Sequence, residues 1–326
     1  MHMQRRELMA IIGTAAAAWP LVARAQQPAK KPRLGVPLYS TPEEDAQAKA
    51  LREGLRELGY VDGQNISVEY RFAEGKPERL GDLAADLVRL KPDVLFPIGG
   101  DVAPFVSKAT QTIPIVFVMS ADPLQLGLVA SFARPGGIAT GFTFLQDALA
   151  SKRLELLKEV APRISRVAFL SNPDHPDNEL RVAQQAATAL GVHLQPIDMR
   201  GPGDLDGALQ TITKVSVDAL YVVASRQTVA SLPRIVDFAT KNELPLAGGW
   251  GAWAQAGGLL SYGPNVGEVV RNAATYVDKI FKGAKPGDLP VQQPTRFELL
   301  INLRSAMALR LSIPESFLLR ADKVIE

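Results

Sequence analysis

The stretch VLFPIGGDVAPFVSKATQTIPIVFVM, residues 94–119, contains one complete strand–helix–strand unit. An apolar run at 94–98 ends in two glycines, a helix-period segment follows at 102–110, and a second apolar run occupies 113–119. Neither run shows the apolar/polar alternation of a half-exposed strand, which predicts parallel strands that are buried on both faces. The unit therefore predicts an α/β fold in which helices cover both sides of a sheet.

The same alternation extends on both sides of this unit. Before it, we expect strands at 33–39 and 66–72 and helices at 43–59 and 76–90, and after it a strand at 138–144. The pattern then starts again. Its helices are expected at 149–160, 178–190, 205–213 and 228–241, and its strands at 166–171, 193–199, 219–224, 245–249 and 258–262.

The remaining segments suggest how the two halves connect. An amphipathic helix is expected at 266–283, followed by a strand at 297–303 and a short helix at 304–309. We predict two doubly wound lobes. The N-terminal lobe would comprise 32–145 with about 264–285, and the C-terminal lobe 146–263 with about 286–326. Several crossings of the chain between the lobes would form a hinge.

The N-terminus has the pattern of an export signal. Arg5 and Arg6 precede an apolar run at 8–22, and Ala23-Arg24-Ala25 forms a small-x-small cleavage site. The paired arginines fit the twin-arginine route, and the general secretory route has nearly the same pattern. A membrane anchor is the alternative, but the run is shorter than the ~20 residues that span a bilayer and Pro20 interrupts it.

We therefore expect residues 1–25 to be removed and the mature protein to be in the periplasm. The chain has no cysteine, which excludes a lipid anchor at the cleavage site, a disulfide and thiolate chemistry. After cleavage, 33 basic and 33 acidic residues remain. This balance and the absence of basic runs argue against a nucleic-acid partner. No later apolar run reaches spanning length, so we expect a soluble protein.

Catalytic residues are scarce in the sequence. His175 and His193 are the histidines after the signal, and neither has a partner at metal-ligand spacing. His193 begins a predicted strand and is expected to be structural. His175 lies in a loop at the carboxyl end of a strand, where it could face a ligand, although a solvated loop histidine is the more common outcome. A Gly-x-Ser-x-Gly motif is absent, and Gly99-Gly100-Asp101 lacks the remaining residues of a nucleotide-binding loop. The sequence favours a binding protein without a metal or cofactor over an enzyme.

Ligands of open α/β sheets bind beyond the carboxyl ends of the strands. The loops there carry glycines, small polar side chains and aromatic residues, which suits a small organic ligand. Each loop also has a structural interpretation. Ser40 could cap the first helix, Gly99-Gly100 could serve only the turn, and Asp122 could initiate a turn or bind a ligand amine. Trp250 and Trp253 could be core residues or a wall for a flat apolar group.

Several longer segments resemble the substrate-binding proteins of ABC transporters, in particular the bacterial group with tryptophan- and tyrosine-type binding proteins. They include REGLRELGYVDGQN at 52–65, LGDLAADLV at 80–88 and AGGLLSYG at 256–263. The resemblance covers the whole chain. It implies a type I periplasmic-binding fold, in which two Rossmann-like lobes clamp a ligand across a hinge of three strands.

The resemblance also implies a set of ligand-binding positions. Matched one by one, they lie after strands of both lobes, and Trp250 is added from its aromatic loop. The candidates are Ser40, Thr41, Gly100, Asp101, Ser120, Asp122, Asn172, Asn178, Ser225 and Trp250. One departure concerns Asp101, where relatives commonly have a small residue or threonine. A second is Asn172-Pro173-Asp174-His175-Pro176, where they have Asn-Pro-Asn.

The expected function is capture of a small organic solute in the cleft between the lobes and its delivery to an ABC permease in the inner membrane. An aromatic or amino-acid-like solute is one option, and branched amino acids and short acyl compounds are others. We expect a monomer without a membrane anchor. One alternative is a sensory module for a receptor kinase or chemoreceptor, and another is a secreted α/β enzyme.

Overall fold

The computed structural model describes residues 31–41, 45–144, 146–175 and 177–326. The expected export signal, residues 1–25, lies outside these residues. In the described part of the chain, none of the helices combines the length and hydropathy that crossing a membrane requires.

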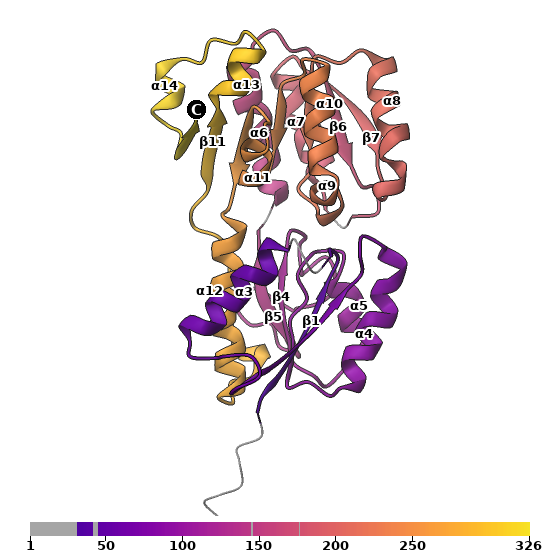
Figure 1. The fold of residues 1–326 in the computed structure, drawn as a ribbon, viewed down its shortest axis with the longest axis vertical. Coiled ribbons are helices and arrows are strands. Elements are labelled where there is room, and N and C mark those ends of the chain that lie inside the picture. The colour runs from indigo at the N-terminus through magenta and orange to yellow at the C-terminus, as the bar shows by residue number, and fades with distance from the viewer. Residues whose placement is uncertain (1–30, 42–44, 145, 176) are drawn as a thin grey trace, which may run out of the picture. The chain divides into compact units, whose positions relative to one another are not determined.

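The N-terminal lobe is built on a five-stranded sheet in which every strand is parallel to its neighbours (Figure 1). The strands have the order β2-β1-β3-β4-β5. Their bounds are β1 Arg33–Leu38, β2 Ser67–Phe72, β3 Val94–Leu95, β4 Ile115–Met119 and β5 Ala139–Thr143. Strand β3 is shorter than expected, although a single bridge between Leu38 and Ile98 continues its pairing.

Strand β4 shows why this sheet is buried on both faces. Val116 and Val118 pack with helices α3 (Ala46–Glu57) and α12 (Val266–Phe281). Phe117 and Met119 point to the other face and pack with α4 (Leu80–Arg89) and α5 (Ala103–Ala109). All four side chains have no exposed surface. The continuous apolar run in the sequence is thus divided between two cores.

Helices α3 and α12 lie side by side although more than 200 residues separate them in the sequence (Figure 1). Gly54 permits this approach, because a Cβ there would lie 2.4 Å from the carbonyl oxygen of Arg271. Arg271 also forms a 3.1 Å ion pair with Glu53. The late helix α12 is therefore part of the N-terminal lobe.

The C-terminal lobe contains a seven-stranded sheet in the order β12-β11-β10-β9-β8-β6-β7. All neighbours are parallel except β10 and β11. The bounds are β6 Arg166–Ser171, β7 His193–Asp198, β8 Ala219–Val222, β9 Leu246–Gly248, β10 Leu260–Gly263, β11 Glu298–Asn302 and β12 Lys323–Ile325.

Helices cover both faces of this sheet as well. Helices α6 (Gln146–Val160) and α7 (Glu179–Ala189) pack on one face, and α8 (Leu205–Val215) and α10 (Leu232–Lys241) pack on the other. The short helices are α9 Arg226–Ala230, α11 Gly251–Gln255, α13 Leu303–Ala308 and α14 Glu315–Leu318. The two sheets, each covered by helices on both faces, confirm the predicted α/β fold class.

The single helix expected at 228–241 is wrong, because α9 ends before Ser231 and α10 begins after it. Pro233, in the first turn of α10, has no N–H to donate to a carbonyl four residues earlier, so the helix cannot run through this point. The short α11 and α14 and strand β12 were not expected.

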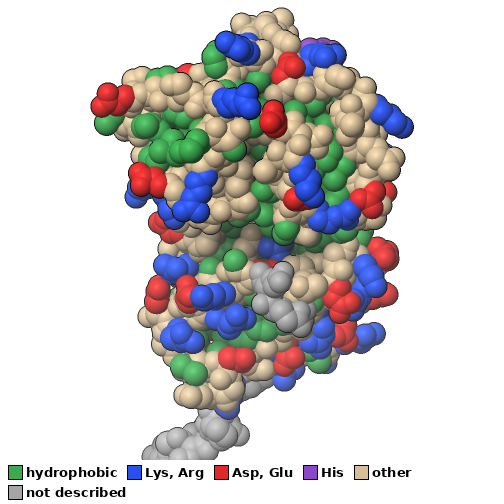
Figure 2. Space-filling view, turned by 45° about the horizontal axis from the view of Figure 1, so that its top comes forward, with side chains coloured by type: hydrophobic (Ala, Val, Ile, Leu, Met, Phe, Trp, Pro, Cys, Tyr) green, Lys and Arg blue, Asp and Glu red, His purple; other side chains and the backbone are tan. Residues whose placement is uncertain are grey.

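The chain passes between the two sheets after β5, after β10 and before β11. The tail was expected to join the C-terminal lobe from about residue 286. Instead, Gln292 forms a bridge with Phe142 of β5, and the carbonyl of Leu289 accepts a 2.6 Å hydrogen bond from Thr140 of the same strand. The tail reaches the second sheet at Glu298. On the face shown in Figure 2, acidic and basic side chains are interspersed over both lobes.

Candidate functional site

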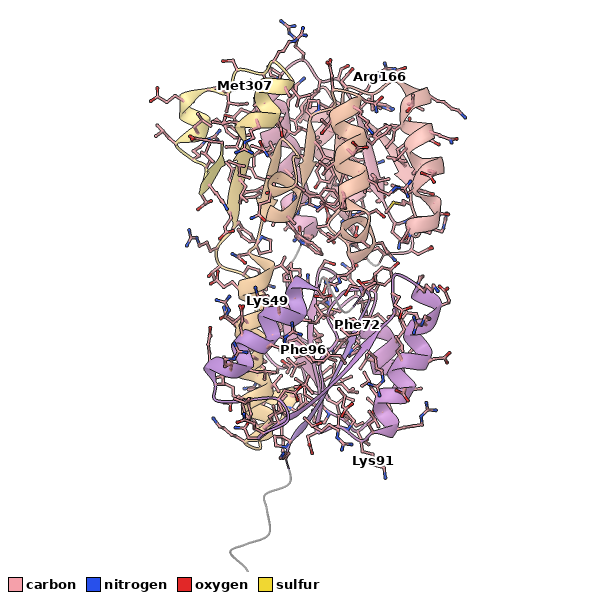
Figure 3. All side chains as sticks on the ribbon, viewed as in Figure 1. Lys49, Phe72, Lys91, Phe96, Arg166 and Met307 are labelled. Atoms are coloured by element: carbon pink, nitrogen blue, oxygen red, sulfur yellow. The ribbon has the colours of Figure 1, made fainter. Side chains whose placement is uncertain are left out.

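The carboxyl ends of the strands of both sheets meet between the lobes. Lys91, which precedes β3, and Arg166, which begins β6, lie at opposite outer ends of residues 33–326 (Figure 3). Loops that follow β4 and β6 are instead in contact, because Ser120 Oγ lies 3.2 Å from His175 Nε2. The loops after the strands therefore form an interlobe face, where ligands of α/β sheets bind.

Arg226 makes three contacts across this face. It is the first residue of α9 in the C-terminal lobe, and its guanidinium donates to Gln47 Oε1 at 2.5 Å and to Ser40 Oγ at 3.0 Å. It also forms an ion pair with Asp45. Arg226 and Asp45 are both more than nine-tenths buried. One arginine thus binds three side chains of the opposite lobe.

Asp45 has a second role as the N-cap of α3. Its Oδ1 accepts hydrogen bonds from the backbone N–H groups of Gln47 and Ala48. Burial would raise the pKa of this carboxyl, but the charge of Arg226 and the hydrogen bonds from Ser40, Ala48 and Arg226 lower it below its ordinary value. Of the two interpretations of Ser40, the helix cap is wrong, since Asp45 occupies the cap and Ser40 donates to Asp45.

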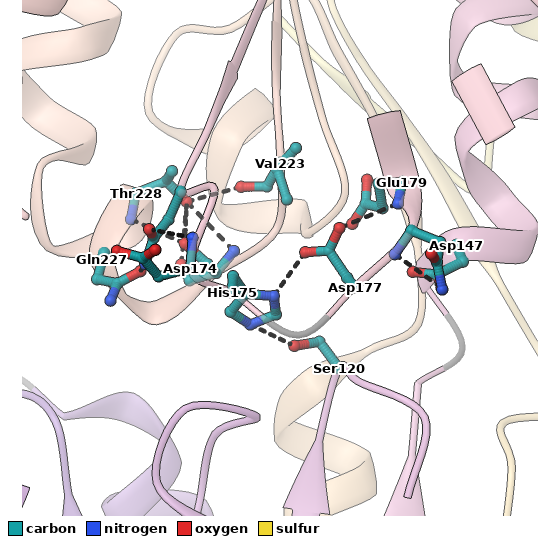
Figure 4. Close-up of polar contacts among 12 residues, drawn as sticks. Ser120, Asp147, Asp174, His175, Asp177, Glu179, Val223, Gln227 and Thr228 are labelled. Carbon is teal, nitrogen blue, oxygen red and sulfur yellow. Dashed lines mark hydrogen bonds and ion pairs between the residues drawn. The ribbon is translucent and has the colours of Figure 1, made fainter. Parts of the chain in front are cut away.

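His175 forms the second contact point of the face (Figure 4). Its Nε2 meets Ser120 of the N-terminal lobe, and its Nδ1 lies 2.5 Å from Asp177 Oδ2. Of the two interpretations of this histidine, the solvated loop residue is wrong, because only 5% of its surface is exposed. Burial lowers its pKa, but the hydrogen bond to Asp177 and the nearby acids outweigh burial and raise the pKa above its ordinary value.

Behind His175 lies a buried polar cluster inside the C-terminal lobe. Arg153 of α6 donates to Glu179 at 2.6 Å, to Tyr221 at 2.5 Å and to the Tyr262 carbonyl at 2.9 Å. The side chains of Arg153 and Glu179 are at most 1% exposed. Burial raises the pKa of Glu179, and Arg153 opposes that shift. The cluster joins α6, α7 and β8 beneath the loop that presents His175.

The turn at Gly99–Asp101 brings the N-terminal lobe against the opposite lobe. A Cβ on Gly99 would lie 3.3 Å from Arg226 Cγ, and one on Gly100 would lie 3.3 Å from His175 Nε2. Gly99 also has a φ of 126°, which favours glycine. Both carboxylate oxygens of Asp101 are buried, and neither has a hydrogen-bond partner among the residues that the structure describes.

Asp122 is engaged within its own loop. Its Oδ1 accepts a 2.8 Å hydrogen bond from the backbone N–H of Leu124, and its Oδ2 accepts one of 3.3 Å from Gln125. Of the two interpretations of Asp122, this geometry matches the turn initiator. Gln125 also accepts from Asn178 of the opposite lobe at 3.0 Å. Asn178 precedes α7, and its side chain bridges the lobes without capping that helix.

The remaining polar candidates divide between the face and helix caps. Ser225 is the N-cap of α9 and forms a capping box with Thr228, so its hydroxyl is used locally. Asn172 is buried and donates to Gln227 at 2.6 Å. Gly100 and Ser120 are buried at the interlobe contact, whereas Thr41 is exposed.

The two tryptophans of the aromatic loop differ. Trp253 is fully buried against Gly248, where a Cβ would lie 2.3 Å from its ring, so it is a core residue. Trp250 precedes α11, is 6% exposed and packs edge-on against Phe144, with 6.3 Å between ring centroids. Within the described part of the chain, the indole Nε1 of neither tryptophan has a hydrogen-bond partner. Trp250 therefore differs from Trp253 in its position before α11, and not in its unused donor.

Asp45, Gln47 and Gln227 were not expected at the face, and Arg226 was expected there only as part of the loop Ala224-Ser225-Arg226, without a role of its own. Arg226 and Gln227 directly follow Ser225, which caps a helix after a strand, and this position was the available signal. Asp45 and Gln47 lay in a segment expected to be helical from residue 43, so nothing in the sequence pointed them toward the other lobe.

A separate cavity of about 360 Å³ lies in the C-terminal lobe. Its walls include Glu243 and Leu244, which precede β9, and Gly257 and Leu259, which precede β10. It therefore lies at the amino ends of these strands, away from the interlobe face. The described residues contain no group of three or more His, Asp or Glu side chains that could hold a metal ion.

Comparisons with known proteins agree with the two-lobed α/β fold. The family model for ABC transporter substrate binding proteins matches residues 36–325. A tyrosine-binding protein of Clostridioides difficile is 26% identical over 86% of this chain and 81% of its own length.

Two solved structures are similar over most of the chain. A conserved domain protein of Vibrio cholerae has a TM-score of 0.84 and 28% identity, and covers 90% of this chain and 100% of its own. An ABC domain of Streptococcus pneumoniae in complex with L-Trp has a TM-score of 0.82 and 25% identity, and covers 91% and 100%. Because the family model matches nearly all of the described chain, the protein belongs to the family of ABC transporter substrate-binding proteins.

Proposed function

We propose that this protein is the periplasmic solute-binding component of an ABC import system. It binds a small organic solute between its lobes and presents the closed form to a permease of the inner membrane. The observation that carries the proposal is the interlobe face, where Arg226, His175 and Asn178 of one lobe contact side chains of the other. The similar proteins that bind tyrosine and L-Trp support an amino-acid-like solute.

The contacts across the face explain how binding is coupled to closure. When the lobes separate, water replaces the partners of Arg226 and His175, so the interlobe hydrogen bonds add only a small net free energy to closure. A ligand that contacts both lobes adds free energy to the closed form alone and shifts the population toward it. A permease can then distinguish loaded from empty protein by shape. No covalent step is required.

Localisation and partners follow from the same proposal. The N-terminal pattern around Arg5 and Arg6 supports export and removal of residues 1–25. The mature protein would then diffuse as a monomer in the periplasm, bind its solute there and carry it to the outer surface of the inner membrane. The exposed tips of both lobes, and not the interlobe face, would contact the permease.

Thermal-shift screening of the mature protein against a metabolite library tests the proposal. A ligand at 100 times its Kd adds about 2.7 kcal/mol to the free energy of unfolding. We expect amino acids or related compounds to raise the melting temperature, and recovery of the same compound unchanged after denaturation. A bound compound that is recovered chemically altered would contradict a carrier function, as would a library in which no compound produces a shift.

A further inference from the structure

Asp101 is an anomaly in the electrostatics of the interlobe face. Its two carboxylate oxygens are buried, and neither has a hydrogen-bond partner in the described residues. A buried carboxylate without a partner is costly, since it loses its hydration and receives nothing in return. Its charge acts on both lobes. Burial of Tyr39 is the main cause of the raised pKa of that tyrosine, and the charge of Asp101 is the second cause. The charge of Asp101 also contributes to the raised pKa of His175.

The neighbouring cations are already bound to other acids. His175 uses Nδ1 for Asp177 and Nε2 for Ser120, so neither ring nitrogen is available to Asp101. Arg226 forms its ion pair with Asp45. In the cluster behind, Arg153 forms its ion pair with Glu179 at 2.6 Å.

The other acids near the face each have at least one bonded carboxylate oxygen. Both oxygens of Asp122 accept hydrogen bonds from its own loop. Asp147 Oδ2 accepts a 3.0 Å hydrogen bond from the backbone N–H of Asn178, whereas its Oδ1 is buried without a partner among the described residues. Burial raises the pKa of Asp147, which favours its neutral form. Among the described side chains, Asp101 is thus the acid of the face with neither carboxylate oxygen in a hydrogen bond, and the nearby charge of His175 is already shared with Asp177.

We infer that the solute carries a cationic nitrogen, and that Asp101 binds this group. The inference rests on the proposed function and adds the chemical class of the ligand. A neutral polyol could donate hydrogen bonds to Asp101 but would add no positive charge, and Arg226, His175 and Arg153 are already paired with other acids. A primary ammonium supplies both the donors and the charge. From the sequence, Asp122 was the acid that could bind a ligand amine, whereas the geometry assigns this role to Asp101.

Titration calorimetry with matched probes tests the inference. L-tryptophan, L-tyrosine and L-leucine are each compared with the acid that lacks only the amino group: indole-3-propionate, 3-(4-hydroxyphenyl)propionate and 4-methylpentanoate. D-ribose and glycerol represent neutral polyols. We expect every bound probe to be an amine and each deaminated partner to bind about tenfold to a hundredfold more weakly, as for a lost charged hydrogen bond.

The variant Asp101→Asn removes the charge and keeps the shape. It should weaken binding of an amine by a similar factor and leave its deaminated partner unchanged. Asp82→Asn is the matched control, because Asp82 is an exposed acid on α4 of the same lobe. Without ligand, Asp101→Asn should raise the melting temperature by about 2–4 °C, since it relieves an unpaired buried charge.

Three results would overturn the inference. One is a deaminated acid or polyol that binds at least as tightly as every amine, which leaves the proposed function intact. The second is Asp101→Asn binding amines as the Asp82→Asn control does. The third is a lower melting temperature of ligand-free Asp101→Asn, which would give Asp101 a structural partner. If no solute of any class binds, both the inference and the proposed function fail.

Discussion

Two buried arginine–carboxylate pairs have similar chemistry and different locations. Arg153 and Glu179 join α6 to α7 within the C-terminal lobe. Arg226 and Asp45 join α9 of that lobe to the cap of α3 in the other. The first pair stays closed as long as the lobe is folded. The second opens whenever the lobes separate. Location thus determines whether such a pair stabilises the fold or biases a conformational equilibrium.

The largest effect is expected from Arg153→Met. This change leaves Glu179 buried without its cation, and breaking a buried pair costs about 3–5 kcal/mol. Urea denaturation should show that loss of unfolding free energy. The exposed neighbour Lys152→Met is the control and should change it by about 0.5 kcal/mol or less. A loss below about 1 kcal/mol for Arg153→Met would show that the two pairs do not differ as described.

A smaller effect is expected from His175→Gln, and it depends on pH. The folded protein raises the pKa of His175 above its ordinary value of 6.5, so its contribution to stability is fully present below pH 6.5. The contribution is lost as the pH rises through the raised value. At low pH, the unfolding free energy of wild type should exceed that of His175→Gln by about 1.5–3 kcal/mol, the range of a charged hydrogen bond.

Urea denaturation at several pH values between 5 and 9 measures this difference. It should shrink as the pH increases. A difference that grows with pH would contradict the raised pKa and the hydrogen bond to Asp177. The exposed His193→Gln serves as the control, since it lies at the start of β7.

The smallest effect on stability is expected from Arg226→Gln. In the open form, water solvates both Asp45 and the new amide, so the unfolding free energy should change by less than about 1 kcal/mol. Affinity for the solute should fall about tenfold, because closure loses a charged hydrogen bond. A loss of stability as large as that of Arg153→Met would mean that the interlobe pair does not open.

Asp45→Ala sharpens this comparison. It removes the same ion pair and also the N-cap of α3, so it should cost about 1 kcal/mol more stability than Arg226→Gln. The fall in affinity should be similar for the two variants. Equal stabilities would show that the cap contributes little, and affinity that is lost only in Asp45→Ala would show that the helix, and not the pair, matters for binding.

The fold could be predicted because its signal is local. Apolar runs such as 115–119 are buried on both faces, and their spacing with helical segments specifies a doubly wound sheet. Boundaries and short elements were less accessible. The break at Ser231 depends on Pro233, and β12 is only three residues long. The segment at 289–292 remains with β5 through long-range bonds that no local pattern encodes.

The site was predictable by position and not by role. Loops after the strands were expected to meet, and Ser120 and Asn178 do form hydrogen bonds between the lobes, whereas Asn172 donates to Gln227 within its own lobe. The local sequence did not show which side chains already form hydrogen bonds within the protein. Asp122 and Ser225 form hydrogen bonds within their own loops, and Asp101 does not. The partner of Arg226 comes from a helix 181 positions earlier in the chain.

The location of the ligand is the central claim, and amide hydrogen exchange tests it most directly. The compound with the largest thermal shift is added to the mature protein. We expect slower exchange at the turns of the interlobe face, residues 99–102, 120–125, 172–175 and 225–228. We expect no change around the other cavity, at 241–244 and 302–309. Protection at that cavity with none at the interlobe turns would contradict a ligand site between the lobes.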